Sequence, residues 1–242
     1  MSESSAGEHA ADHAGDRDFE IYLRPTRFID CDAPTVAAYA LKAVGEERDE
    51  IGKALKLYYA VRDDVRYDPY SIDLRPEHFT ASACLERGYG FCITKATLLA
   101  AAGRAVGLPT RLGFADVRNH LCTARLKEQM GGTDVFIYHG YAEFHLEGKW
   151  VKATPAFNLS LCEKFRVLPL EFDGRTDSVF HPFDADGRKH MEYVRDRGNT
   201  ADVPFADIRR DFLAFYPLIY AHQVDGHGGE EFENEAETEA LT

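Results

Sequence analysis

Apolar residues recur at helical spacing in the first part of the chain and predict two consecutive helices. From Ile51 to Val65 they stand three or four residues apart, which places them on one face of a helix. Upstream, Asp32 is a typical N-cap residue and Pro34 suits a first helical turn. We therefore expect one helix from this point to about Gly45 and a second that ends near Val65.

Strand-like patterns stand on both sides of these helices. Phe19–Thr26 alternates weakly and predicts a short strand, and Thr110–Val117 predicts another. Asp134–Leu146 and Lys149–Pro155 predict the two strands of a hairpin. A last helix is expected near Val203–Tyr220. Together these elements indicate an α+β fold.

A glycine-rich turn leads into a helix with a small-residue stripe. Gly88 and Gly90 predict a tight turn directly before Cys92. From Cys92 to Val106 small residues recur at helical steps, so another element must pack closely against this helix. At its first turn, free backbone N–H groups and the helix dipole favour a thiolate, and the N–H of Cys92 could face an oxyanion. Lys95, one turn further on, is expected to be solvated.

The other cysteines lack this setting. The chain has five cysteines: Cys31, Cys84, Cys92, Cys122 and Cys162. Their spacings are wide and no CxxC pair occurs, so neither a zinc knuckle nor a thioredoxin motif fits. A buried structural thiol is the usual role of any single cysteine. Its place after the glycine turn makes Cys92 the candidate nucleophile.

A reactive thiol needs a base within hydrogen-bond reach, and His139 is the candidate. It stands inside an otherwise apolar and aromatic strand, where an imidazole is costly unless it is hydrogen-bonded or used in chemistry. The two-residue period of a strand places His139, Tyr141 and Glu143 on one face. A hydrogen-bonded core histidine and a catalytic base both agree with this pattern.

Composition supports one large domain between two polar ends. The chain has 242 residues, of which 45% are hydrophobic, enough to bury a core. Residues 1–17 and 226–242 lack apolar periodicity and are expected to be disordered, the second as an acidic tail, so the domain spans residues 18–225. A net charge of −13 opposes binding to nucleic acid or anionic lipid, although such a charge also simply favours solubility.

Targeting and metal signals are weak. Residues 1–17 carry four acidic residues against one basic residue and no apolar stretch, which is unlike a signal peptide, so we expect a cytoplasmic protein. No apolar run approaches the roughly 18 residues of a membrane helix. Residues 181–190 contain His and Asp, but their spacing fits neither a helix-face metal pair nor a calcium loop. We expect neither a metal nor an organic cofactor.

Several short motifs occur in an order and spacing that resemble the transglutaminase-like superfamily, over about residues 58–158. They are Gly90–Ala96 (GFCITKA), Gly107–Arg111 (GLPTR), His139–Glu143 (HGYAE), Gly148–Val151 (GKWV) and Thr154-Pro155. Each motif alone is weak, and the ordered set is more specific. The resemblance implies a helical layer carrying the cysteine, packed on an antiparallel sheet carrying the histidine.

The resemblance also implies a papain-like triad, with Cys92 as nucleophile and His139 as base. The family's third residue is usually an Asp, and this position falls on Thr154. A hydroxyl can orient an imidazole but cannot stabilise an imidazolium as a carboxylate does. Three interpretations stay open: Thr154 is a neutral orienting group, Asn158 or Asp134 supplies the group, or the site is inactive.

The function implied by the resemblance is a cysteine-dependent acyl transfer that acts on the amide bonds of a peptide or protein. Hydrolysis by a peptidase or amidase is favoured over cross-linking, because the chain has the size of family members without accessory β-domains. The alternative is a catalytically silent binding or scaffold protein, for which Thr154 is the best support. An arylamine-type acetyl transfer is less supported, since no feature would bind a coenzyme A phosphate.

Overall fold

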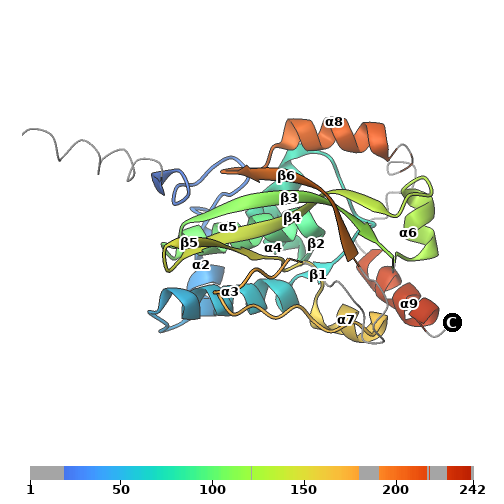
Figure 1. The fold of residues 1–242 in the computed structure, drawn as a ribbon. Coiled ribbons are helices and arrows are strands. Elements are labelled where there is room, and N and C mark those ends of the chain that lie inside the picture. Colours follow the sequence, from blue (N-terminus) through green and yellow to red (C-terminus); the bar gives the residue numbers. More distant parts are fainter. Residues whose placement is uncertain (1–18, 121, 180–190, 217, 219–227, 241–242) are drawn as a thin grey trace, which may run out of the picture.

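The computed structural model describes residues 19–120, 122–179, 191–216, 218 and 228–240 (Figure 1). The helices are α2 (Pro34–Val44), α3 (Glu50–Asp64), α4 (Ala81–Arg87), α5 (Cys92–Ala105), α6 (Ala124–Gln129), α7 (Leu159–Phe165), α8 (Phe205–Phe215) and α9 (Gly228–Ala240), with a 3₁₀ turn at Pro76–Phe79. The strands are β1 (Arg66–Tyr67), β2 (Tyr89–Gly90), β3 (Thr110–Asn119), β4 (Val135–Leu146), β5 (Lys149–Ala153) and β6 (Met191–Thr200). The α+β class is confirmed.

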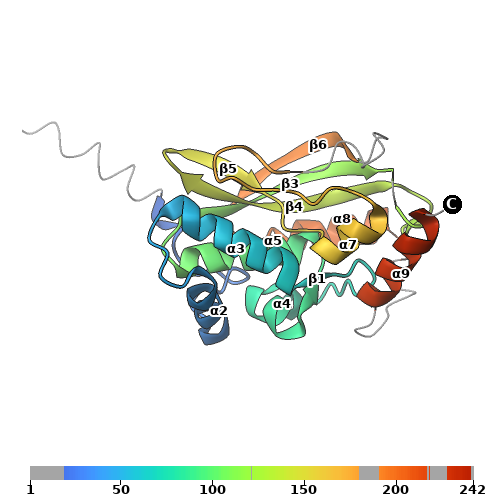
Figure 2. The same cartoon turned by 90° about the horizontal axis from the view of Figure 1, so that it is seen from below.

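Four strands form an antiparallel sheet with the order β5-β4-β3-β6. Figure 2 shows this sheet as one layer, with α5 beneath it and α2 and α4 farther from the sheet. Helix α5 contacts β3 and β4 on one side and α2, α3 and α4 on the other. The helix that begins at Cys92 is therefore the centre of the molecule, and nearly all of its residues are buried.

The small residues of α5 allow this close approach. A Cβ atom built on Gly103 would stand 2.6 Å from Cγ2 of Thr110 and 2.8 Å from the ring of Phe144, on strands β3 and β4. Both distances are well inside van der Waals contact. The prediction that another element packs tightly against the small-residue stripe is confirmed, and that element is the sheet.

Two local predictions were wrong. Phe19–Thr26 is not a strand: Phe19 and Glu20 are helical, turns follow them, and no neighbouring strand pairs with the segment among the described residues. The N-cap of α2 is Ala33 rather than Asp32, with Pro34 as the first helical residue. The predicted hairpin is confirmed as β4 and β5, whose turn holds Glu147 at a positive φ of 49°.

The acidic C-terminal segment is also not the disordered tail that its composition suggests. Residues 228–240 form α9, and Phe232 on its inner face is only 1% exposed. This ring packs against Tyr70 at 5.6 Å and against Phe165 at 5.4 Å between centroids. The expected tail at 1–17 and the parts of the C-terminal tail at 226–227 and 241–242 lie outside the described residues.

The charged face of α9 explains why so acidic a helix docks. Glu230 pairs with Arg66 of β1 at 3.0 Å, and Glu231 and Glu235 both pair with Arg125 of α6. Attraction to basic residues on two other elements offsets the repulsion among the glutamates, while Phe232 supplies apolar burial.

No described helix is long and apolar enough to span a membrane. Within the described ranges, no group of three or more His, Cys, Asp or Glu side chains is arranged to hold a metal ion. The acidic and histidine-containing segment 181–190 lies outside these ranges.

Candidate active site

Cys92 is the first residue of α5 and is 6% exposed. The helix begins here because the Thr94 hydroxyl accepts a hydrogen bond from the backbone N–H of Phe91 at 3.1 Å. The segment that leads into the helix is held by the short parallel pair of β1 and β2. Directly after β1, the N–H of Asp68 donates to the carbonyl of Gly90 at 2.9 Å. These contacts hold the thiol at a defined point beside the sheet.

The thiol of Cys92 meets strand β4 at Gly140. Burial raises the pKa of Cys92 to about 11, while hydrogen bonds from the backbone N–H groups of Gly140, Ile93 and Cys92 itself act in the opposite direction. A Cβ on Gly140 would stand 3.0 Å from Cα of Ile93, so only glycine fits at this contact without a shift. The helix N-terminus alone suggested a thiolate, but in the folded protein desolvation is the larger effect and the thiol is neutral.

His139 directly precedes Gly140 on β4 and is 4% exposed. Its Nε2 atom is buried without a hydrogen-bond partner in the described part of the chain. Burial lowers the pKa of His139 to about 4, so the imidazole is neutral at pH 7. It lines a small cavity together with Thr154, Ala156, Phe157, Leu170, Val179 and Met191.

The backbone just before His139 is strained. Tyr138 has a φ of 55°, an uncommon conformation for a bulky residue. The buried carboxylate of Asp116 on β3 accepts a hydrogen bond from the backbone N–H of Tyr138 at 3.0 Å, next to the register shift between β3 and β4. Arg197 of β6 pairs with Asp116 and stands 4.0 Å from the Tyr138 ring centroid. No sequence pattern indicated this support.

Thr154, to which the resemblance assigns the third position, shares the cavity of His139. Its hydroxyl donates to the carbonyl of Val179 at 2.8 Å, and its N–H donates to the carbonyl of Ser178 at 2.9 Å. The structure thus brings Thr154 and His139 into one cavity without a hydrogen bond between them. The lone pairs of the Thr154 hydroxyl are still able to accept one.

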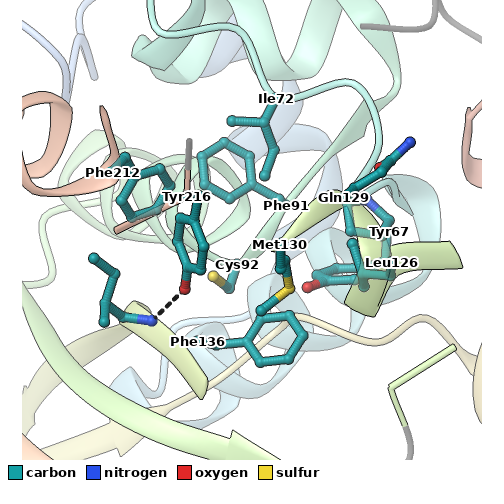
Figure 3. Close-up of a pocket in the computed structure, with 12 residues that line it drawn as sticks. Tyr67, Ile72, Phe91, Cys92, Leu126, Gln129, Met130, Phe136, Phe212 and Tyr216 are labelled. Atoms are coloured by element: carbon teal, nitrogen blue, oxygen red, sulfur yellow. Dashed lines mark hydrogen bonds between the residues drawn. The ribbon is translucent and has the colours of Figure 1, made fainter. Parts of the chain in front are cut away.

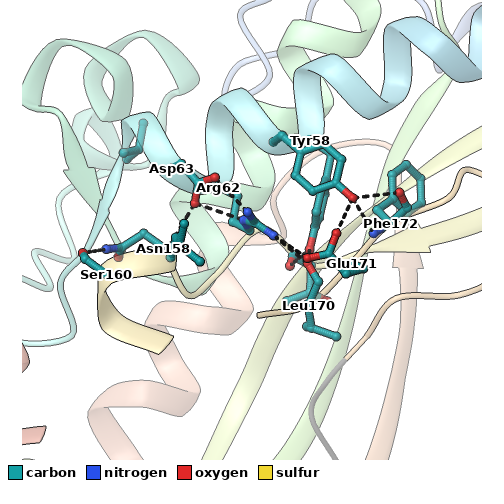
Figure 4. A network of polar contacts seen from close by, with 12 residues as sticks. Tyr58, Arg62, Asp63, Asn158, Ser160, Leu170, Glu171 and Phe172 are labelled. Atoms are coloured by element: carbon teal, nitrogen blue, oxygen red, sulfur yellow. Dashed lines mark hydrogen bonds and ion pairs between the residues drawn. The ribbon is translucent and has the colours of Figure 1, made fainter. Parts of the chain in front are cut away.

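The two other candidates for the third position are bound elsewhere. Oδ1 of Asn158 accepts from the backbone N–H of Tyr67 at 3.0 Å, and its amide donates to Ser160 and to Glu233 of α9. Figure 4 shows Asn158 next to the network around Arg62, which joins α3 to the segment before β6. Asp134 pairs with Arg118 at 3.2 Å.

Lys95 is not the solvated residue that its position suggested. Its side chain is completely buried, and Nζ donates to the backbone carbonyls of Arg62, at 2.9 Å, and of Val65. Burial lowers the pKa of Lys95 to about 7. The lysine therefore binds free carbonyls at the end of α3 and ties this end to α5.

A pocket opens at Cys92 (Figure 3). It has aromatic and aliphatic walls and leaves about 40 Å³ in which the centre of a water molecule fits. Its lining includes Phe91, Leu126, Met130, Phe136, Ile137 and Phe212. Tyr67, Gln129 and Tyr216 add polar groups. The Tyr216 hydroxyl is already occupied, since it accepts from the N–H of Ile137 at 2.7 Å and donates to the carbonyl of Val135 at 2.9 Å.

Comparison with known proteins gives a family and several similar structures, two of which are described below. Residues 37–155 match the family described as the transglutaminase-like superfamily. A structure from Cytophaga hutchinsonii, provisionally named a cysteine protease, is 17% identical and has a TM-score of 0.49. The match covers 78% of this chain and 49% of the Cytophaga chain. A structure from Parabacteroides distasonis, provisionally named a protease, is 17% identical and has a TM-score of 0.36. The match covers 55% of this chain and 26% of the Parabacteroides chain.

This chain therefore spans about half the length of the first of these proteins and about a quarter of the second. No curated protein matches the chain.

Proposed function

Because the chain contains a domain of the transglutaminase-like superfamily at residues 37–155, we propose that it is a cysteine-dependent acyl-transfer enzyme acting on amide bonds of a peptide or protein. Hydrolysis, by peptidase or amidase action, is the proposed outcome. One observation carries the proposal: the backbone N–H of Gly140 interacts with the thiol of Cys92. This contact places a helix-terminal cysteine one residue along β4 from the family's histidine.

The reaction begins from two neutral groups. Since burial keeps the thiol protonated and the imidazole unprotonated at pH 7, the proton moves from Cys92 to His139 as sulfur attacks the carbonyl. The carbon–sulfur bond forms, the C–N bond breaks, and the amine leaves with the proton from the imidazolium. Water then hydrolyses the thioester and regenerates the thiol.

Thr154 is proposed as a neutral orienting group for His139. Its hydroxyl lines the same cavity as His139, whose Nε2 atom has no partner among the described residues. When the ring proton is on Nε2, the hydroxyl oxygen can accept this N–H, and Nδ1 is then free to act as the base. A hydroxyl does not stabilise imidazolium as a carboxylate does, so the imidazolium should be short-lived. This agrees with a mechanism in which the proton moves only during attack.

The test is turnover of a complex peptide mixture, with new termini and lost amides identified by mass spectrometry. Wild type should generate products that Cys92→Ser and His139→Gln do not, and hydroxylamine should trap an acyl group from Cys92. Cys122→Ser, which removes a thiol outside the pocket lining, is the matched control and should retain activity. Products that persist in Cys92→Ser would overturn the proposal.

A silent binding protein is the second candidate. It is favoured by the Thr154 hydroxyl, which donates to the carbonyl of Val179 and leaves Nε2 of His139 without a partner among the described residues. This function predicts that Cys92→Ala keeps the partners and the cellular role of the wild type. Loss of the cellular role in a folded Cys92→Ala protein would contradict it.

A further inference from the structure

Asp116 of β3 lies beside a β-bulge of the neighbouring strand β4. Strand β3 runs between β4 and β6 (Figure 1). The register of β3 and β4 shifts between Ala115 and Val117, so that β4 has one extra residue between Phe136 and His139. A bulge changes the direction of the side chains around it, and bulges are frequent next to active sites.

This bulge decides which residue of β4 meets helix α5. With the bulge in place, Gly140 lies against Ile93, at a point where a Cβ would stand 3.0 Å from a backbone atom. Without the extra residue, His139 would move by one position along β3 and take the place of Gly140, where its side chain does not fit. The bulge therefore directs the imidazole into the cavity that it shares with Thr154.

The bulge contains Tyr138 in the left-handed region, with a φ of 55°. This conformation is costly for a bulky residue, so the surrounding structure must hold it. The buried carboxylate of Asp116 accepts a hydrogen bond from the backbone N–H of Tyr138 at 3.0 Å. At the other end of the residue, the phenol donates to Asp211 of α8 at 2.9 Å. Both the backbone and the side chain of Tyr138 are thus anchored to carboxylates.

Arg197 of β6 joins the groups that hold Tyr138. It is an extra residue of β6 between two that pair with β3, so a second bulge directs it toward the first. Its Nε donates to Asp116, and its Nη1 donates to Asp211 at 3.2 Å. The guanidinium carbon lies 4.0 Å from the centroid of the Tyr138 ring. The side chains of Asp116 and Arg197 are only 8% and 14% exposed, so water weakens their attraction little.

We infer that Asp116 is a positioning residue for His139, and that Arg197 keeps its carboxylate in place. The inference rests on the proposed acyl transfer, in which His139 takes the proton of Cys92. Asp116 acts through the backbone of Tyr138: it stabilises the bulge, and the bulge sets the direction in which the imidazole leaves β4. Thr154 is proposed to orient the ring itself, so the two residues have different roles.

Asp116→Leu removes the acceptor for the N–H of Tyr138, while Arg197 can still pair with Asp211. NMR spectra of protein labelled with ¹⁵N-histidine report the state of the His139 ring without turnover, and His139→Gln identifies its signals. We expect one set of ring signals in wild type and a second set, or broadened signals, in Asp116→Leu. If this variant does not fold, Arg197→Gln releases the carboxylate and should have the same effect on the ring.

Kinetics on a peptide substrate found for the wild type should follow the ring. In Asp116→Leu, kcat should fall by about 10-fold or more with KM within about twofold, because misplacing a reacting group slows the chemical step more than it weakens binding. Asp116→Asn keeps an acceptor oxygen for the N–H of Tyr138 and should restore most of kcat.

A rescue separates positioning from a general loss of stability. Glycine adopts a positive φ without strain, so Tyr138→Gly should form the bulge without help from the carboxylate. In the Tyr138→Gly background, Asp116→Leu should therefore change kcat by less than about twofold, since the two sites are coupled through the bulge. Tyr138→Asn takes the place of the glycine variant if that variant does not fold, because asparagine also tolerates this conformation.

The matched control is Glu143→Leu. Glu143 of β4 is likewise a buried carboxylate that pairs with an arginine of the sheet, Arg111 of β3. These two residues stand directly opposite each other in the regular part of the register, away from the bulge. Loss of this pair should lower stability and still leave one set of His139 ring signals.

The two proposals fail in different ways. Unchanged His139 signals in folded Asp116→Leu, or an equal loss of kcat in the Tyr138→Gly background, overturns the role of Asp116 and leaves acyl transfer standing. A wild type that turns over no amide overturns acyl transfer. The ring signals of Asp116→Leu then decide by themselves whether the carboxylate directs His139.

Discussion

The backbone N–H of Gly140 interacts with Sγ of Cys92 where the first turn of α5 crosses β4. This contact joins the helix layer to the sheet and fixes the thiol next to the residue that follows His139. The space for it exists because position 140 has no side chain: a Cβ would stand 3.0 Å from the backbone Cα of Ile93. The geometry of the candidate site therefore depends on the absence of a side chain at Gly140.

Gly140→Ala should move the start of α5 away from the sheet. Because the nearest atom is backbone rather than a flexible side chain, we expect a loss of about 1–3 kcal/mol in the free energy of unfolding, as in other overpacked cores. The rate of Cys92 alkylation should change as well. The control is Gly45→Ala, where φ is +58° but nothing lies within 4 Å, so backbone strain should lower stability without affecting the thiol. Equal alkylation profiles in both variants would contradict this account.

The pH dependence of Cys92 alkylation should show a weakly acidic thiol. Since burial raises its pKa to about 11, the iodoacetamide rate at this residue should keep rising above pH 9. Mass spectrometry assigns the labelled site, and Cys92→Ala gives the background. A plateau at or below pH 8.5, about the value of a free thiol, would mean that the N–H groups at the helix terminus outweigh burial.

The sequence was a good guide to the elements of the site. The small-residue stripe after the glycine turn correctly indicated a helix packed tightly on another element, and the alternating pattern around His139 correctly indicated a hairpin. Both signals are local, because each is generated by neighbours within one element. The roles of Cys92, His139 and Thr154 stay predictions.

The features that the sequence did not indicate depend on contacts between residues that are far apart in the chain. Lys95 is buried because two carbonyls at the end of α3 face it, and no local pattern encodes such an encounter. The strained Tyr138 is supported by Asp116 from another strand. Helix α9 is compositionally an acidic tail, and only the basic and aromatic residues of other elements give its Phe232 face a place to dock.

Phe232→Ala tests whether α9 docks through its apolar face. The ring is almost completely buried among Tyr67, Tyr70 and Phe165, so its loss should lower the free energy of unfolding by about 3 kcal/mol. Glu230→Gln breaks an exposed ion pair with Arg66 and should cost less than about 1 kcal/mol. Urea unfolding of both variants checks this order. Similar stabilities would mean that the helix contributes little to the fold in solution.

His139 should make the protein less stable in mild acid. Its pKa is about 4 in the folded state, against about 6.5 for an unfolded chain, so between these values the unfolded state binds the extra proton. The free energy of unfolding therefore falls as the pH falls from 6.5 towards 4, by about 3 kcal/mol from this group alone. Denaturant unfolding at several pH values should show a flatter dependence in His139→Gln. An unchanged slope would indicate that the imidazole is solvated.

Thr154→Asp would place a carboxylate in the cavity where Nε2 of His139 has no partner among the described residues. A negative charge there favours imidazolium, so the pKa of His139 should rise from about 4, and NMR titration of the ring measures it directly. A more basic His139 takes the Cys92 proton more readily, and acyl transfer should accelerate by about 10-fold or more.

Thr154→Asn separates charge from shape. The amide oxygen can accept the same hydrogen bond but carries no charge, and both variants lose the bond from the Thr154 hydroxyl to the carbonyl of Val179. We expect the pKa of His139 to rise clearly more in Thr154→Asp than in Thr154→Asn. Equal values in the two variants would show that position 154 does not reach the imidazole. The threonine would then have no part in orienting His139, although the resemblance to the family assigns it the third position.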